Sequence, residues 1–333
     1  MSEKKLGYNI RIKGEKVNVE VKNDYLEIAK RADNAGIYYL SFPEFFGRFD
    51  PNRLHVVPYI ASIAAITEHA KLGTDILQVP LLHPKHIADI GASLDIISEG
   101  RFVLGVGTGW VPSEFENFGV PYEKRGKITD ESLDIIIKMW TQPSIAEYNG
   151  KFFKLRNVCS PPPVQKPHPP IWVGEQSDAA LRRTAQYGNE WASDFWYVED
   201  SGIPEEEWSH EERLKKLKEY CEKFGRELVL GRKPKTPKEV GYNVRINLNV
   251  NPDKEKAIKE MEHFWVNVRK GRTQGGGSLE MKLRYAAFGN AEDVIEKLNE
   301  VYKIGTYCII LYPLSTDSKT QWDRIEKEII PSL

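Results

Sequence analysis

Residues 72–107 read LGTDILQVPLLHPKHIADIGASLDIISEGRFVLGVG and hold two apolar segments on either side of an amphipathic one. The two apolar segments, residues 72–79 and 101–107, are short, which is typical of strands that are buried on both faces. Residues 86–98 between them carry apolar side chains at helical spacing. A buried strand, a crossover helix and a second buried strand form the unit from which parallel sheets are built.

The same alternation runs along the rest of the chain. Further strands are predicted at residues 6–12, 38–42, 171–174, 190–195, 240–250 and 306–313. Further helices are predicted at residues 24–35, 56–69, 127–140, 178–187, 205–224, 253–270 and 290–302, with a last one from residue 317. About eight apolar strands that alternate with helices predict a closed (β/α)8 TIM barrel with insertions. A doubly wound open sheet is the alternative, because the pattern alone does not show closure.

Two stretches interrupt this alternation, and we expect both to be insertions in a single domain over residues 1–333. At about 145–170, an Asn-Gly pair between strand-like flanks predicts a hairpin, and a proline-rich run follows it. At about 271–288, the insertion begins with GRTQGGGSLE. This segment predicts a loop that is mobile without substrate and orders over the barrel mouth.

Charge and composition limit the partners of the chain. It carries 47 Lys and Arg against 48 Asp and Glu, whereas nucleic-acid-binding domains usually have a basic excess. Its 3 cysteines are far apart, which argues against a disulfide framework and a structural zinc site. His83 and His86 have no third ligand at a metal-site spacing, so no metal is expected. The start, MSEKKLGYNI, lacks the apolar core of a signal peptide, and no apolar stretch is long enough to span a bilayer, so we expect a cytoplasmic protein.

The C-terminal ends of the strands carry the active site in barrels of this type. After the second predicted strand, Glu44 lies among Phe42, Phe45 and Phe46. A carboxylate among aromatic side chains is a candidate acid or base, because burial raises its pKa. The alternative is a loop glutamate with its carboxylate in water.

Alternate glycines end the fourth predicted strand, where GVGTGW holds Gly105, Gly107 and Gly109. Such positions let the backbone approach a planar or phosphorylated ligand closely, although glycines also relieve crowding inside a barrel. The segment is not a dinucleotide fingerprint, because the third glycine is missing and the next residues, VPSEF, do not open a helix directly. Trp110 follows the glycines at once.

A helix start follows the fifth predicted strand, in GEQSDAALRR, with Ser177 or Asp178 as its cap. The free N–H groups and the dipole of a helix start make an anion site suited to a phosphate, and Arg182 and Arg183 add charge there. The alternative is an ordinary capped helix without a ligand.

Residues 72–126, from LGTDILQVP to YEKRG, are similar to the bacterial-luciferase-like superfamily of flavin-dependent oxidoreductases. PPIWVGEQSDAALRRTAQYGNEW and FGNAEDVIEKLNEVYKIG continue the likeness, which covers about residues 20–315. The resemblance implies a (β/α)8 barrel whose mouth binds FMN or the deazaflavin coenzyme F-420.

The resemblance also implies which positions hold the cofactor. A non-prolyl cis peptide that supports the flavin ring falls at about Asp75-Ile76. The segment that borders the ring matches Gly107, Thr108 and Gly109. The phosphate-binding turn matches Gly174, Glu175, Gln176 and Ser177, in agreement with the helix start described above.

Two departures from the family's deazaflavin sugar dehydrogenases concern acid–base groups. Those enzymes carry Asp-His where this chain has Glu44 and Phe45, and Trp110 replaces their acidic residue after the glycines. Glu44 is therefore the one obvious proton carrier, and a sugar substrate is not carried over. Phe42, Phe45, Phe46 and Trp110 are predicted to line the substrate pocket, and an aromatic, mostly uncharged mouth suits an apolar compound.

Three functions are compatible with this resemblance. In a two-component monooxygenase, reduced FMN from a separate reductase reacts with O2 and oxygenates a small, largely apolar organic substrate, shielded from water by the protein. A deazaflavin-dependent dehydrogenase or reductase transfers hydride without O2. A non-catalytic flavin-binding protein is the third, but such members tend to have lost strands. We expect the monooxygenase, as a homodimer like many similar proteins.

Overall fold

The computed structural model describes residues 4–11, 18–44, 54–195, 209–265, 279–315 and 317–333. Its strands are β1 (Lys5–Asn9), β2 (Tyr39–Phe42), β3 (Lys71–Thr74), β4 (Leu77–Gln78), β5 (Phe102–Gly107), β6 (Ile145–Asn149), β7 (Lys154–Val158), β8 (Ile171–Val173), β9 (Glu190–Asp194), β10 (Glu227–Leu228), β11 (Glu239–Val250), β12 (Ala287–Gly289) and β13 (Cys308–Pro313). Its helices are α1 (Val19–Asn34), α2 (Val56–Ala64), α3 (Pro84–Ile97), α4 (Pro112–Asn117), α5 (Arg125–Thr141), α6 (Asp178–Tyr187), α7 (His210–Lys223), α8 (Lys254–His263), α9 (Leu279–Arg284), α10 (Ala291–Lys303) and α11 (Ser318–Arg324).

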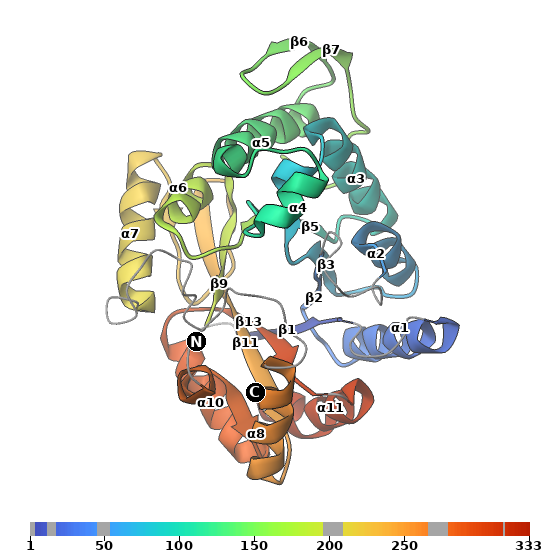
Figure 1. Cartoon of the computed structure of the whole chain (residues 1–333), viewed down its shortest axis with the longest axis vertical. Coiled ribbons are helices and arrows are strands. Elements are labelled where there is room, and N and C mark those ends of the chain that lie inside the picture. The colour runs from blue at the N-terminus through green and yellow to red at the C-terminus, as the bar shows by residue number, and fades with distance from the viewer. Residues whose placement is uncertain (1–3, 12–17, 45–53, 196–208, 266–278, 316) are drawn as a thin grey trace.

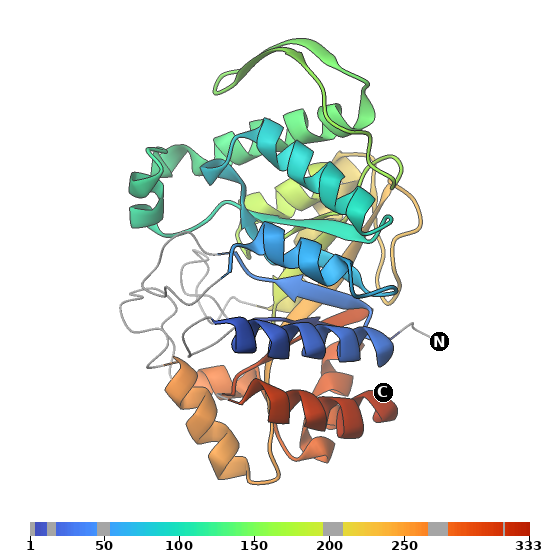
Figure 2. The same cartoon turned by 90° about the vertical axis from the view of Figure 1, so that its right-hand side faces the viewer.

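Eight of these strands close into a barrel. Around the ring they run β1, β2, β3, β5, β8, β9, β11 and β13, and β13 pairs with β1 again. All these pairings are parallel, and the helices lie around the outside of the strands (Figure 1). Figure 2 shows α1, α2 and α3 stacked along one side. The predicted (β/α)8 TIM barrel is confirmed, and the open-sheet alternative is wrong.

Alternation along each strand separates an outer core from the barrel interior. On β11, Tyr242 and Val244 point outward into the large core between strands and helices. Their neighbours Asn243 and Arg245 point inward and are buried, because successive strand residues face opposite sides. A second, smaller apolar cluster fills part of the interior and consists of Tyr39, Val103, Trp172, Ala192, Tyr307, Cys308 and Ile310.

The third predicted strand is interrupted at its middle. Residues 72–79 were expected to be continuous, but β3 ends at Thr74 and β4 begins at Leu77. The Asp75-Ile76 peptide bond between them is cis, so the expected position of the non-prolyl cis peptide is confirmed. Both pieces pair with β5, which keeps this strand in the barrel wall.

Two local expectations have different outcomes. The hairpin is confirmed, because β6 and β7 pair antiparallel and project beyond α5 in both views (Figures 1 and 2). The expectation that no helix follows the strand-four glycines is wrong, since the short helix α4 begins at Pro112, a residue favoured in a first helical turn. The glycine spacing still differs from a dinucleotide fingerprint.

Several predicted segments lie wholly or partly outside the described residues. They are Phe45, Phe46, residues 205–208 and 266–270 of two predicted helices, and residues 271–278 of the predicted lid. The remainder of the second predicted insertion holds α9 and the short strand β12, which pairs parallel with β11. No helix in the described part of the chain is long and apolar enough to cross a membrane.

Candidate active site

The glycines at the end of β5 allow β3 and β4 to lie close to that strand. A Cβ on Gly105 would be 1.8 Å from the carbonyl oxygen of Thr74, and one on Gly107 would be 1.8 Å from Ile76 Cδ1. Relief of crowding therefore explains Gly105 and Gly107. Gly109 has φ +75°, and a Cβ there would be 2.3 Å from Gln78 Oε1, so its conformation and its surroundings both favour glycine.

A second glycine faces the same isoleucine from the end of β8. A Cβ on Gly174 would lie 3.0 Å from Ile76 Cγ2 and 3.6 Å from Arg245 Nη2. The space beside Ile76 is thus bordered by backbone at the ends of β5 and β8. Any residue larger than glycine at position 174 would narrow this space. A planar ring needs such a surface, so Ile76, Gly107 and Gly174 fit a flavin. We call these three residues the ring bed.

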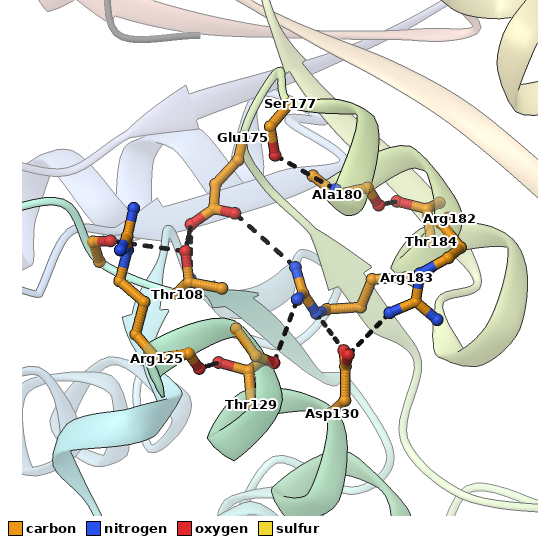
Figure 3. Close-up of polar contacts among 12 residues, drawn as sticks. Thr108, Arg125, Thr129, Asp130, Glu175, Ser177, Ala180, Arg182, Arg183 and Thr184 are labelled. Carbon is orange, nitrogen blue, oxygen red and sulfur yellow. Dashed lines mark hydrogen bonds and ion pairs between the residues drawn. The ribbon is translucent and has the colours of Figure 1, made fainter. Parts of the chain in front are cut away.

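Glu175 connects the turn after β8 with the end of β5 (Figure 3). Its Oε1 accepts hydrogen bonds from the backbone N–H and the hydroxyl of Thr108, each at 2.5 Å. Its backbone has φ +78°, and its carbonyl accepts the indole N–H of Trp191 at 3.0 Å. The carboxylate therefore already uses donors that an anionic ligand would need.

The helix start that follows is capped as expected, and Ser177 is the cap. Its hydroxyl accepts the N–H of Ala180 at 3.3 Å. Asp178 instead forms an ion pair with Lys216 and accepts the hydroxyl of Tyr220 at 2.6 Å. The remaining N–H groups of a first helical turn have no partner within the helix, which makes the start of α6 suitable for a phosphate.

Gln176 faces away from this helix start. Its buried amide donates to the carbonyl of Asp194 at 2.9 Å and lies 3.3 Å from the Ser193 hydroxyl. A ligand at the start of α6 therefore meets the backbone of Gln176 rather than its side chain.

Both arginines of α6 are engaged by α5. Asp130 accepts from Arg182 and from Arg183, each at 2.7 Å (Figure 3). Arg183 also lies 3.9 Å from Glu175 Oε2. Asp130 and Glu175 therefore offset the positive charge that these arginines were expected to add at the helix start. An anion bound there would depend more on backbone N–H groups.

Arg125 is a further cation near the end of β5 that the sequence analysis did not identify. Its guanidinium lies 3.9 Å from the ring centroid of Tyr122 and donates to the Tyr122 carbonyl at 3.1 Å. The Tyr122 hydroxyl in turn donates to the carbonyl of Trp110. The only sequence signal was the position of Arg125 shortly after the strand-four glycines.

Glu44 is buried beside the start of α2. It is 7% exposed, and its Oε2 accepts the N–H of Val56 at 3.3 Å and lies 3.9 Å from His55 Nδ1. The alternative of a carboxylate in water is therefore wrong. An anion at this position is stabilised by the positive end of the α2 dipole.

The predicted aromatic lining is only partly described. Phe42 is buried and packs edge-on against Tyr59, with 5.5 Å between ring centroids. Trp110 is 39% exposed. An open, mostly apolar pocket lies near Glu44, because Pro43, the residue before it, belongs to the lining. The pocket is lined by Ile10, Arg11, Phe42, Pro43, Leu54, Val56 and Tyr59.

A group of charged side chains lies inside the barrel on the β9 and β11 side. Arg245 donates to Asp75 Oδ1 at 2.7 Å, and its Nε lies 2.9 Å from Asp194 Oδ1. Tyr312 donates its hydroxyl to the other carboxylate oxygen of Asp75. We call these four residues the Arg245 cluster. The expectation of a mostly uncharged mouth is thus wrong for this side, and Arg11 also lines the pocket next to β2.

Burial and charge act in opposite directions on Arg245. Burial alone would lower its pKa, but the negative charges of Asp194 and Asp75 outweigh burial and raise it above the usual value. The guanidinium is therefore always protonated. The sequence does not reveal this cluster because Asp75 and Arg245 are 170 positions apart, and its only signal is the row of alternating polar residues in β11.

No three His, Cys, Asp or Glu side chains gather as a metal site within the described ranges. His83 instead begins α3, where its Nδ1 accepts the N–H of Lys85 at 3.2 Å. Burial lowers the pKa of His83, with a further contribution from His86. These contacts agree with a structural part for His83 at the helix start.

Known proteins match this chain over most of its length. A family model described as luciferase-like monooxygenase matches residues 10–308. The oxygenase component of a flavin-dependent trigonelline monooxygenase from Acinetobacter baylyi is 27% identical over 185 residues, which are 54% of this chain and 50% of that protein. This chain thus spans about half of that relative's length.

Solved structures extend the likeness to the whole fold. Monooxygenase RslO1 from Streptomyces bottropensis has a TM-score of 0.78 at 21% identity, covering 98% of this chain and 99% of its own. An F420-dependent secondary alcohol dehydrogenase has a TM-score of 0.76 at 17% identity, covering 98% of each chain. At such low identity these structures show the fold and leave the cofactor open. With the family match over most of its residues, this chain belongs to the luciferase-like monooxygenase family, a family of oxidoreductases.

Proposed function

We propose that this protein is the oxygenase component of a two-component monooxygenase that acts on a small, largely apolar organic substrate with reduced FMN and O2. The observation that carries the proposal is the ring bed, which lies between β3 and β4 and at the ends of β5 and β8, close to the phosphate-suited start of α6. The flavin-dependent relative, itself an oxygenase component, supports a flavin cofactor and a separate reductase. When bound, the reduced flavin would supply the chemistry that activates O2.

The cofactor residues divide into two groups. Ile76, Gly107 and Gly174 would support the ring, with Asp75 and Gly109 at its borders. The second group would hold the phosphate through backbone N–H groups and consists of Glu175, Gln176 and Ser177, whereas Thr108, whose N–H and hydroxyl donate to Glu175, would border the ring. Since Asp130 engages both arginines of α6, these uncharged donors would carry most of the binding.

Glu44 would be the proton carrier of the site. Its carboxylate is buried at the start of α2, and its neighbour in the chain, Pro43, and its hydrogen-bond partner Val56 line an open, mostly apolar pocket next to β2. Phe42 lines that pocket, and we propose that Phe45, Phe46 and Trp110 complete a lining that keeps water from the reacting substrate.

Anaerobic titration with FMN and with coenzyme F-420, each oxidised and reduced, tests this function by fluorescence. We expect tight binding of reduced FMN and weak binding of F-420. Gly174→Val, which places a side chain against Ile76, should lower the affinity for FMN by about tenfold or more, equivalent to about 1.4 kcal/mol of binding energy. Ala146→Val, at an exposed position of strand β6 in the hairpin, is the control.

Two results would contradict the proposal. Preference for F-420 would identify a hydride-transfer enzyme and remove O2 from the reaction. Binding of neither cofactor would leave the family relationship as evidence of fold and ancestry only.

A further inference from the structure

Arg245 lies where the proposed cofactor residues converge. Its Nη1 contacts the carboxylate of Asp75, next to Ile76 in the chain. Its Nη2 is 3.6 Å from the Cβ position of Gly174, and Ile76 Cγ2 is 3.0 Å from the same position. The guanidinium is therefore adjacent to the ring bed, although it comes from β11, which contributes no residue to that bed.

The position of this charge is fixed by partners after β3 and on β9. Nη2 also donates to the carbonyl of Ala192 at 3.0 Å, and Nε lies 2.9 Å from Asp194. The Arg245 side chain is 7% exposed, and that of Asp75 is 3% exposed. Because its partners come from the end of β3 and from β9, the guanidinium cannot turn away without breaking several buried contacts at once.

A fixed cation beside a flavin affects its two redox states unequally. Two-electron reduction with uptake of one proton adds one negative charge to the ring, and a nearby positive charge stabilises that added charge. The effect is largest where water is excluded, as it is around a buried guanidinium.

We propose that Arg245 is a positioning residue that makes this site bind reduced flavin more tightly than oxidised flavin. This inference rests on the proposed function. Asp75 and Asp194 hold the guanidinium in place and partly offset its charge, so the strength of the preference depends on all three residues.

The test compares dissociation constants for oxidised and reduced FMN, measured anaerobically by fluorescence on the full chain. In Arg245→Met the preference for reduced FMN should fall by about tenfold or more, which corresponds to a midpoint potential about 30 mV lower for a two-electron couple. Arg245→Lys, which keeps the charge, should retain most of the preference. Arg101→Met is the matched control, because Arg101 is half-buried and bonds backbone carbonyls near α2, away from the ring bed.

A second variant keeps the test decisive if Arg245→Met does not fold. Asp194→Asn removes a negative charge that offsets Arg245, and it should shift the preference further toward reduced FMN. Unchanged ratios in the folded variants, with FMN still bound by the unaltered protein, would overturn this inference and leave the proposed function intact. Failure of the unaltered protein to bind FMN would overturn both.

Discussion

At the scale of single residues, the surroundings of Glu44 are compatible with two roles, one structural and one catalytic. The N–H of Val56 makes it a cap for α2, a structural part that many helix-start carboxylates have. The apolar pocket beside Phe42 makes it a candidate proton carrier for a substrate bound there. A substitution that preserves the hydrogen bond but removes the proton separates these two parts.

Glu44→Gln is that substitution. The amide oxygen can still accept the N–H of Val56, so the loss of stability should be small, about 0.5 kcal/mol from the weaker interaction with the helix dipole. Affinity for FMN should be unchanged, whereas turnover of a confirmed substrate should fall about 100-fold, the usual effect of losing a general acid or base. Asp253→Asn at the start of α8 is the matched control. A normal rate would remove Glu44 from the mechanism.

At the scale of elements, the strand order and the strand-end glycines were predictable because both depend on local pattern. Apolar runs such as residues 101–107 occupy the barrel wall, and the cis peptide at Asp75-Ile76 was expected from the family pattern, whereas the break of the strand there was not. The contacts of Arg245 and Glu44 were not predictable. Arg245 and Glu44 contact segments that become neighbours only when the barrel closes or when the chain after β2 packs on α2. No spacing in the sequence predicts these contacts.

The turn between β8 and α6 also shows what a local pattern leaves out. GEQSDAALRR correctly indicated a capped helix start with Ser177 as one of two possible caps. It did not show that Glu175 bonds Thr108 across the gap to β5, or that Asp130 on α5 engages both arginines. Each of these contacts changes the charge available to a phosphate.

Glu175→Gln tests how the negative charge of the Glu175 carboxylate affects phosphate binding. A carboxylate close to a phosphate repels it, so removing the charge should tighten FMN binding several-fold, about 1 kcal/mol, and leave riboflavin affinity unchanged. Fluorescence titration with both ligands measures the two effects. Glu300→Gln on the surface of α10 is the control. Weaker FMN binding in Glu175→Gln would mean that the carboxylate supports the cofactor rather than competing with it.

At the scale of the whole molecule, one buried carboxylate links strands from different parts of the barrel. Glu190 on β9 accepts from Asn243 on β11 at 2.9 Å and from the hydroxyl of Tyr307 at 2.8 Å. Burial raises its pKa from 4.5 to about 7, although both hydrogen bonds act in the opposite direction. Because burial removes the solvent that would stabilise a charge, the folded barrel favours the protonated acid more than the unfolded chain does.

The pH dependence of stability follows from that shift. Between pH 4.5 and about 7 the unfolded chain has released the Glu190 proton while the folded barrel retains it, so the folded state loses stability as pH rises through this window. A shift of this size corresponds to about 3 kcal/mol, and the loss is complete above the folded pKa. Below pH 4.5 both states are protonated and Glu190 contributes no penalty.

Glu190→Gln should remove this loss. The amide can accept from Tyr307 and can donate to Asn243 Oδ1, which has no hydrogen-bond partner among the described residues. In urea unfolding from pH 5 to 8, the variant should gain free energy of unfolding over the unaltered protein as pH rises, by about 2–3 kcal/mol at pH 8. Glu147→Gln on the exposed hairpin should give a flat difference. A flat difference for Glu190→Gln as well would mean that Glu190 ionises in the folded barrel as readily as it does in the unfolded chain.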